Sequence, residues 1–113
     1  IHMPDFEATL AIYDRACAAA DIPRKGKNLV YTSANGHMFS QMNKDGELGV
    51  RLPKPRQQDM GQEFGAGPFK SYGATMRDYI CLTGDMLADE GLIASLLKEA
   101  LAFVEAMPPG KKK

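Results

Sequence analysis

Apolar residues recur at helical spacing near both ends of the chain. Near the N-terminus, steps of three or four residues predict a helix from about Pro4 to Ala20, with one apolar stripe made of Phe6, Leu10, Tyr13, Cys17 and Ala20. Near the C-terminus a stronger pattern predicts a long helix that begins at Asp89-Glu90 and ends at Pro108, with a stripe made of Leu92, Ile93, Leu96, Leu97, Ala100, Leu101 and Val104. Each helix therefore has one face to bury.

The pattern between the two helices predicts mainly strands. Lys27–Met42 predicts a hairpin, because Asn35-Gly36 is the strongest short indication of a two-residue turn. Leu48, Val50 and Leu52 alternate with polar residues and predict a third, half-buried strand that ends at Pro53 and Pro55. A short helix is predicted over 57–64, an edge strand over 69–72 and a covered strand over 76–82, with Thr83-Gly84-Asp85 as a break.

This order of elements predicts an α+β domain. We expect a single antiparallel sheet of four to five strands, with the N- and C-terminal helices packed on it. The 113 residues suit one domain, which we assign to 4–108. Residues 1–3 resemble a cloning scar with the initiator Met, and residues 109–113 are expected to be a flexible basic tail.

Composition and cysteine usage narrow the classes of function. The formal net charge of zero gives no global field toward nucleic acid or membrane, and no apolar run reaches the roughly 18 residues that span a bilayer. Cys17 and Cys81 lie far apart without a CxxC motif, which is typical of reduced residues in a cytoplasmic protein. One histidine outside the first three residues cannot complete a zinc set, so we expect no metal and no cofactor.

Residues that could support catalysis are few and scattered. Phosphate-binding GxxxxGK[ST] and nucleophile GxSxG motifs are missing from the sequence. Asp78, His37 and Cys81 remain as candidates for a small enzyme, which is the least favoured hypothesis. For Asp78, which interrupts an apolar strand beside Arg77, an ion pair is favoured over a perturbed acid.

Charge is unevenly distributed along the chain. Residues 22–56 carry a net charge of +5, whereas the segments before and after carry −3 and −2. The candidates for contacting a partner or nucleic acid are therefore Arg24, Lys25, Lys27, Arg51 and Arg56. The favoured interpretation is that acidic helices of the same chain or of a second protomer complement this basic region. The seven methionines read as core filling, and a Met-lined groove for a partner peptide is the alternative.

Several short motifs occur in an order that resembles a known family. Asn35-Gly36-His37-Met38-Phe39, Asp45-Gly46 and Arg51-Leu52-Pro53 are followed by Gly67-Pro68-Phe69, Gly73, Met76 and Tyr79. The chain resembles the N-terminal domain of the TfoX/Sxy competence-regulator family, and the residues that carry the motif are Asn35, Gly36, Met38, Phe39, Gly46, Leu52, Pro53 and Tyr79. Two departures are the stretch at residues 24–28, where many members have Met-Phe-Gly, and the end of the chain at Lys113, before the family's helical C-terminal domain.

The resemblance implies an α+β domain without catalytic activity, linked to transcriptional control of natural transformation together with the cyclic-AMP receptor protein. We therefore expect a non-enzymatic, cytoplasmic interaction domain that acts through a protein partner such as a transcription regulator, and that forms a homodimer through opposite charges and an open sheet edge. Direct nucleic-acid binding through the basic region is the alternative.

Overall fold

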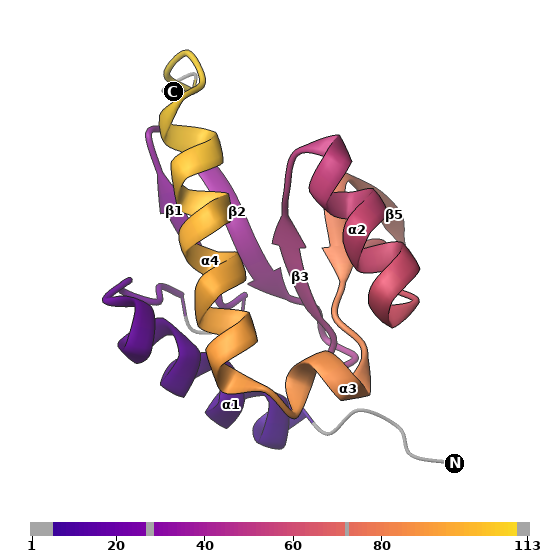
Figure 1. Ribbon diagram of the computed structural model, residues 1–113. Helices are drawn as coiled ribbons and strands as arrows, with labels where there is room; N and C mark the ends of the chain where they lie inside the picture. Colours follow the sequence, from indigo (N-terminus) through magenta and orange to yellow (C-terminus); the bar gives the residue numbers. More distant parts are fainter. Residues whose placement is uncertain (1–5, 27–28, 72, 111–113) are drawn as a thin grey trace.

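The chain is organised around one antiparallel sheet whose strands follow the order β1-β2-β3-β5-β4, as this computed structural model shows (Figure 1). The structure describes residues 6–26, 29–71 and 73–110. The elements in chain order are α1 (Phe6–Ala20), β1 (Tyr31–Ala34), β2 (His37–Met42), β3 (Leu48–Arg51), α2 (Lys54–Phe64), β4 (Gly67–Ser71), β5 (Ala74–Cys81), α3 (Gly84–Leu87) and α4 (Glu90–Glu105). The predicted α+β class, with one antiparallel sheet and a helix near each end of the chain, is confirmed.

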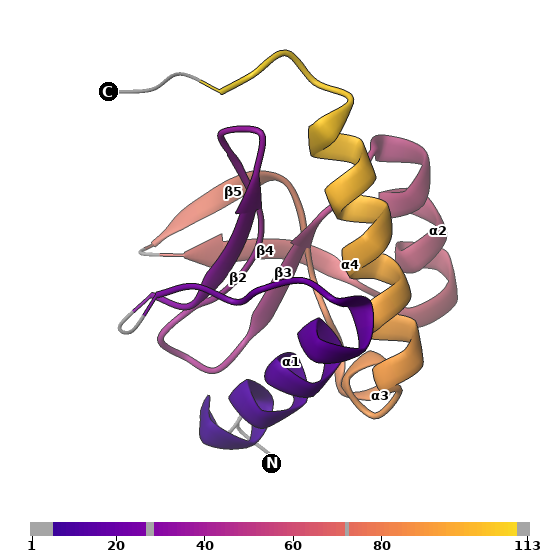
Figure 2. The same ribbon diagram turned by 90° about the vertical axis from the view of Figure 1, so that its left-hand side faces the viewer.

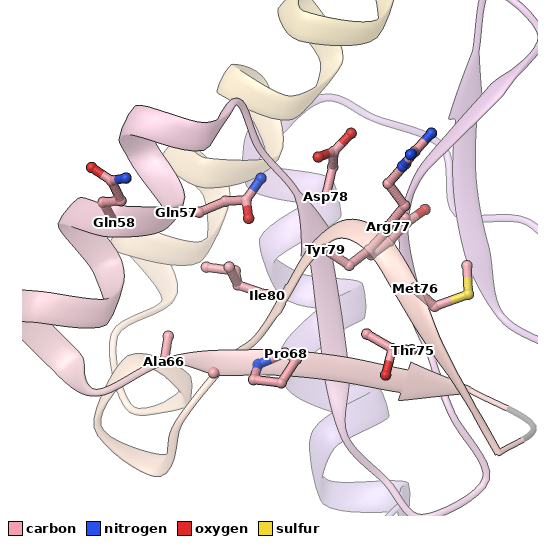
Figure 3. Close-up of a pocket in the computed structure, with 11 residues that line it drawn as sticks. Gln57, Gln58, Ala66, Pro68, Thr75, Met76, Arg77, Asp78, Tyr79 and Ile80 are labelled. Carbon is pink, nitrogen blue, oxygen red and sulfur yellow. The ribbon is translucent and has the colours of Figure 1, made fainter.

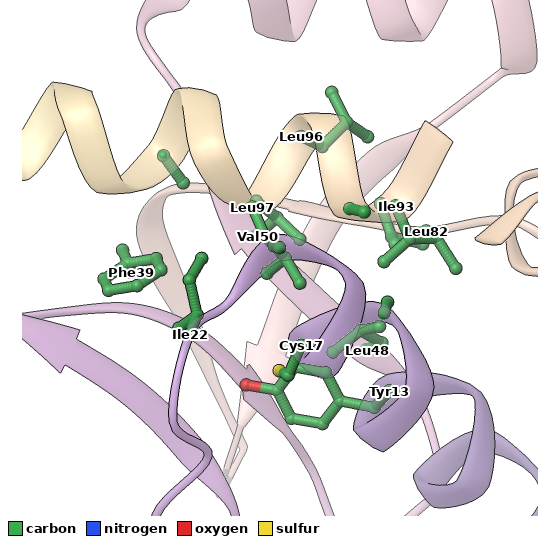
Figure 4. Close-up of a cluster of buried hydrophobic side chains, with 14 of the residues drawn as sticks. Tyr13, Cys17, Ile22, Phe39, Leu48, Val50, Leu82, Ile93, Leu96 and Leu97 are labelled. Atoms are coloured by element: carbon green, nitrogen blue, oxygen red, sulfur yellow. The ribbon is translucent and has the colours of Figure 1, made fainter. Parts of the chain in front are cut away.

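The main core lies between the sheet and helices α1 and α4. The two helices pack against each other, and α4 also crosses β1, β2 and β3 (Figures 1 and 2). Tyr13 and Cys17 of α1, Leu97 of α4 and Val50 of β3 are all buried in this cluster (Figure 4). Burial of each large apolar side chain is worth roughly 1.5–3 kcal/mol, so the two amphipathic stripes seen in the sequence supply much of the folding free energy.

Polar groups within this core have partners. The Tyr13 hydroxyl bonds to the Ser40 hydroxyl, which also bonds to Thr32, and all three side chains are buried. Burial raises the pKa of Tyr13, so its hydroxyl remains protonated well beyond neutral pH. The polar chain therefore ties α1 to β1 and β2 without leaving a charge in the core.

The predicted turn at Asn35-Gly36 forms, and it also contacts the end of α4. Both residues have positive φ, 55° and 78°. The Asn35 side-chain amide donates to Val104 O (3.0 Å) and Met107 O (2.8 Å), and Gly110 N donates to Asn35 O (2.9 Å). The hairpin turn therefore caps the C-terminus of α4, where carbonyl groups lack partners within the helix.

Some boundaries differ from the sequence prediction. Helix α2 begins three residues before the predicted start, because Pro53 occupies its N-cap and Pro55 lies in its first turn, where proline is tolerated. The predicted break after β5 contains α3, whose N-terminus is capped by the Thr83 hydroxyl accepting from Met86 N. Strand β5 does end before this segment, at Cys81, and the helical turn that follows it was not predicted.

Candidate functional site

Strand β5 contains a large bulge that breaks its pairing with β4. Between the paired positions Pro68–Ile80 and Lys70–Thr75, the four residues Met76 to Tyr79 face the single residue Phe69. Asp78 has a φ of 67°, which is uncommon for a residue other than glycine, and its carbonyl accepts from Leu52 N at 3.0 Å. Bulges of this kind redirect side chains and are frequent beside functional sites.

A small second cluster supports the bulge from β4. Phe69 is fully buried and stacks on Tyr79, with 5.8 Å between ring centroids. The Phe69 ring also covers Gly49, since a Cβ at that position would lie 2.4 Å from the ring. The Tyr79 side chain is thus fixed in place by packing.

Two open depressions border the bulge. The first, of about 390 Å³, lies between α2 and strands β4 and β5, and Asp78 and Gln57 are among the residues that line it (Figure 3). The second, of about 310 Å³, lies between the β1–β2 turn and the bulge, and is lined by Gly36, His37, Met38, Arg51, Met76, Arg77 and Tyr79. Pairing between β2 and β3 reaches only Ser40–Val50, and the two strands diverge beyond it at this end of the sheet (Figure 1).

The second depression, which we call the hairpin–bulge recess, is rich in donor groups. Arg77 is exposed and makes no hydrogen bond or ion pair with another described residue, while Met76 and Arg77 point away from α2 (Figure 3). The Tyr79 hydroxyl and Arg51 Nε are buried without a hydrogen-bond partner in the described parts of the chain. Burial raises the pKa of Tyr79, so the hydroxyl is a neutral donor at pH 7.

Arg51, which lines the recess, makes two contacts with residues that do not line it. Its Nη2 lies 3.9 Å from Asp78 Oδ2, and its guanidinium is 5.9 Å from the centroid of the Phe103 ring. At 3.9 Å the contact with Asp78 is a long ion pair. The ion pair expected for Asp78 therefore forms, with Arg51 of the neighbouring strand as the partner.

The basic candidates that the structure describes have separate partners on different elements. Arg24 pairs with Asp14 of α1, and Lys25 Nζ lies 3.0 Å from Ser33 Oγ beside β1. Arg56 pairs with Glu99 of α4 at 2.7 Å and also with Asp59, and the Glu99 hydrogen bond raises its pKa. Lys27 lies outside the described residues. Only Arg51 borders the hairpin–bulge recess.

The residues that carry the family resemblance are mostly structural in position. Phe39 and Leu52 are fully buried, Pro53 is the N-cap of α2, and Gly46 has a φ of 82° in the turn between β2 and β3. Asn35 caps α4, whereas Gly36, Met38 and Tyr79 line the recess. Three of the eight motif residues thus converge on one surface feature.

The three residues weighed for catalysis occupy separate environments. His37 Nε2 lies 2.8 Å from Pro108 O, and Asp78 faces Arg51. Burial raises the pKa of Cys81 to about 12, which keeps the thiol protonated at neutral pH. Cys17 and Cys81 are both free thiols. Among the described residues, no group of three or more His, Cys, Asp or Glu side chains is arranged to hold a metal ion.

Arg77, which lines the recess, is not among the basic candidates from the sequence and appears there only as a neighbour of Asp78. The charged pair Arg77-Asp78 inside an otherwise apolar strand was the available indication, because such an interruption is typical of a bulge. Met76 was assigned to core filling, yet it lines both depressions.

Comparison with known proteins gives no match: no family model fits the chain, and neither a curated protein nor a solved structure is significantly similar to it. In the parts of the chain that the structure describes, no helix has both the length and the apolar character needed to cross a membrane.

Proposed function

We propose that this chain is a non-enzymatic interaction domain that docks a segment of a protein partner in the hairpin–bulge recess. The observation that carries the proposal is the composition of the recess: the side chains of Met38 and Met76 lie beside Arg77, which has no partner among the described residues. Methionine adapts its shape to different apolar side chains, and arginine is enriched in protein interfaces. The resemblance to the TfoX/Sxy N-terminal domain agrees with this role and suggests a partner in transcription regulation.

The proposal includes a cytoplasmic location, which two free and widely separated cysteines favour. The proposal also includes a homodimer. Strand pairing across the β4 edge is disfavoured by Pro68 and Lys70, and Tyr31 of β1 already bridges to Lys25. We therefore expect any two-fold contact to use complementary charged surfaces, and light scattering that shows only monomer at high protein concentration would remove the dimer from the proposal.

Site-specific photo-crosslinking tests the docking surface. Benzoylphenylalanine replaces Met38 or Met76 in the recess, or Ala19 on the exposed side of α1 as the control, and each protein is irradiated in lysate of the source organism. We expect Met38 and Met76 positions to capture the same protein, and Ala19 not to capture it. Equal capture from Ala19 would contradict the proposal, and capture that disappears after nuclease treatment would favour the nucleic-acid alternative.

A further inference from the structure

We infer that the hairpin–bulge recess contains a subsite for a carboxylate, and that its occupant is an acidic side chain of the docked partner segment. This inference rests on the proposed function, because the partner segment supplies the carboxylate. It concerns the groups that line the second depression, at the end of the sheet where β2 and β3 diverge.

The first argument is the charge of the lining. Arg51 and Arg77 both border the recess, and none of the described residues that line it is acidic. Asp78, which lies between Arg77 and Tyr79 in sequence, lines the first depression, between α2 and strands β4 and β5 (Figure 3). The contact from Arg51 to Asp78 is 3.9 Å long and leaves Arg51 Nε unpaired. A carboxylate in the recess would therefore meet two guanidinium groups and no like charge from the lining.

The second argument is the unpaired donor of Tyr79. This side chain is 6% exposed, its ring is fixed by stacking on Phe69, and its hydroxyl has no hydrogen-bond partner in the described parts of the chain. Most buried polar side-chain atoms in native proteins are hydrogen-bonded, so the unpaired hydroxyl of a residue that lines a recess calls for an explanation. A carboxylate oxygen that accepts from Tyr79 and from the arginines would satisfy it.

The third argument is that the neighbouring helix end does not oppose an anion there. The C-terminus of α4 lies close to the β1–β2 turn, and its carbonyls carry partial negative charge. Asn35 donates to two of these carbonyls, and His37 Nε2 lies within hydrogen-bond distance of Pro108 O. These contacts place donor groups on carbonyls of that helix end, which lowers their repulsion of an anion.

A comparison of matched ligands tests the subsite. The probes are a capped Leu-Asp-Leu tripeptide, its neutral Leu-Asn-Leu analogue, and inorganic phosphate, each titrated into the isotope-labelled chain by amide NMR. We expect Leu-Asp-Leu to shift the resonances of residues 36–38 and 76–79, and to bind about tenfold more tightly than the Asn analogue, as a charge-assisted hydrogen bond implies. Equal affinity of the two tripeptides would overturn the inference, and so would phosphate binding at these resonances without tripeptide binding.

Three variants assign the effect to named groups. Arg77→Gln should weaken Leu-Asp-Leu binding by about tenfold, and Tyr79→Phe should weaken it by several-fold. In the free protein, Tyr79→Phe should leave the urea midpoint unchanged or raise it, because it removes an unpaired buried hydroxyl; a lower midpoint would assign that hydroxyl to the fold and overturn its role here. Arg15→Gln is the control, because Arg15 lies on α1 and pairs with Glu90 of α4. This variant should bind Leu-Asp-Leu as tightly as the wild type does.

The two proposals can fail separately. If crosslinking at Met38 and Met76 succeeds but the tripeptides bind equally, the subsite is refuted and the docking surface stands. If Leu-Asp-Leu binds as expected but neither position captures a protein, the function proposed above is refuted, and the inferred occupant is refuted with it.

Discussion

One side-chain amide, that of Asn35, joins the hairpin turn to the end of α4. It donates to Val104 O and Met107 O, while its backbone has a φ of 55°. Asparagine is one of the few residues that adopt this left-handed conformation readily and can also donate hydrogen bonds. The dipeptide that closes the hairpin therefore also secures the last helix, and the two roles can be separated by mutation.

Asn35→Ala should lower the free energy of unfolding by about 2–3 kcal/mol, because it removes two hydrogen bonds and places a Cβ in the left-handed region. Asn35→Gly should cost about 1 kcal/mol less, since glycine restores the backbone freedom. Urea denaturation measures both. Asp21→Gly is the control: Asp21 also has a positive φ of 57° but is exposed, so it should be unchanged or slightly more stable. An Asn35→Ala variant within about 0.5 kcal/mol of wild type would contradict the capping role.

Gly49 permits the second cluster to form. The Phe69 ring lies where a Cβ of residue 49 would project, within 2.4–2.6 Å of three ring atoms. Gly49→Ala should therefore displace Phe69 and cost about 2 kcal/mol of stability, and Phe69→Leu in the same chain should recover part of that loss. Gly61→Ala in α2, where the nearest atom is 3.4 Å away, should be neutral or stabilising by up to about 1 kcal/mol. If thermal denaturation gave both alanine variants the same midpoint, the packing argument would fail.

At the scale of elements, predictions from local sequence succeeded where local chemistry decides the structure. The β1–β2 hairpin follows from Asn35-Gly36, whose conformational preference does not depend on distant residues. The start of α4 follows from Asp89, which accepts from Leu92 N at 3.0 Å. Both are properties of a few consecutive residues, and the sequence displays them directly.

Elements whose limits depend on distant contacts were predicted less well. Helix α2 has few apolar residues; it is held by Met60 in the core and by Arg56, which reaches Glu99 of α4. The bulge of β5 exists only in relation to β4 and β3, which pair with it on either side. Arg51 could be proposed as a candidate from its charge alone. The place of Arg77 in the recess depends on the bulge, and therefore on the pairing of β5 with distant strands.

At the scale of the whole molecule, part of the uneven charge of the sequence is balanced by ion pairs inside the fold. Arg24 pairs with Asp14 and Arg56 with Glu99, so basic residues of the middle segment meet acidic residues of α1 and α4. This agrees with the favoured interpretation of the charge pattern. It also leaves Arg77, which lies outside that basic segment, as a cation with no partner among the described residues.

A second property of the whole molecule is its set of buried groups that ionise at high pH. Burial raises the pKa of Cys17 from about 9 to about 12, and it raises the pKa of Tyr13 and Tyr79 as well. Above pH 9 the unfolded chain therefore releases protons that the folded chain retains. Because the folded state then binds more protons, the free energy of unfolding must fall as pH rises.

We expect full stability at pH 7.5 and a loss of about 1–2 kcal/mol at pH 10.5 from Cys17 alone, with Cys81 adding to it over the same range and the tyrosines adding to it above pH 10. Urea denaturation under reducing conditions at the two pH values measures the difference. Cys17→Ala lowers stability at both pH values because it creates a cavity. The fall in its free energy of unfolding from pH 7.5 to pH 10.5 should nevertheless be smaller than that of the wild type, because one ionising group is gone. The Cys17 thiol lies in the core between α1 and the sheet, where burial disfavours its ionised form. An equal loss of stability in the two proteins would contradict this, because the thiol would then ionise as readily in the folded chain as in the unfolded one.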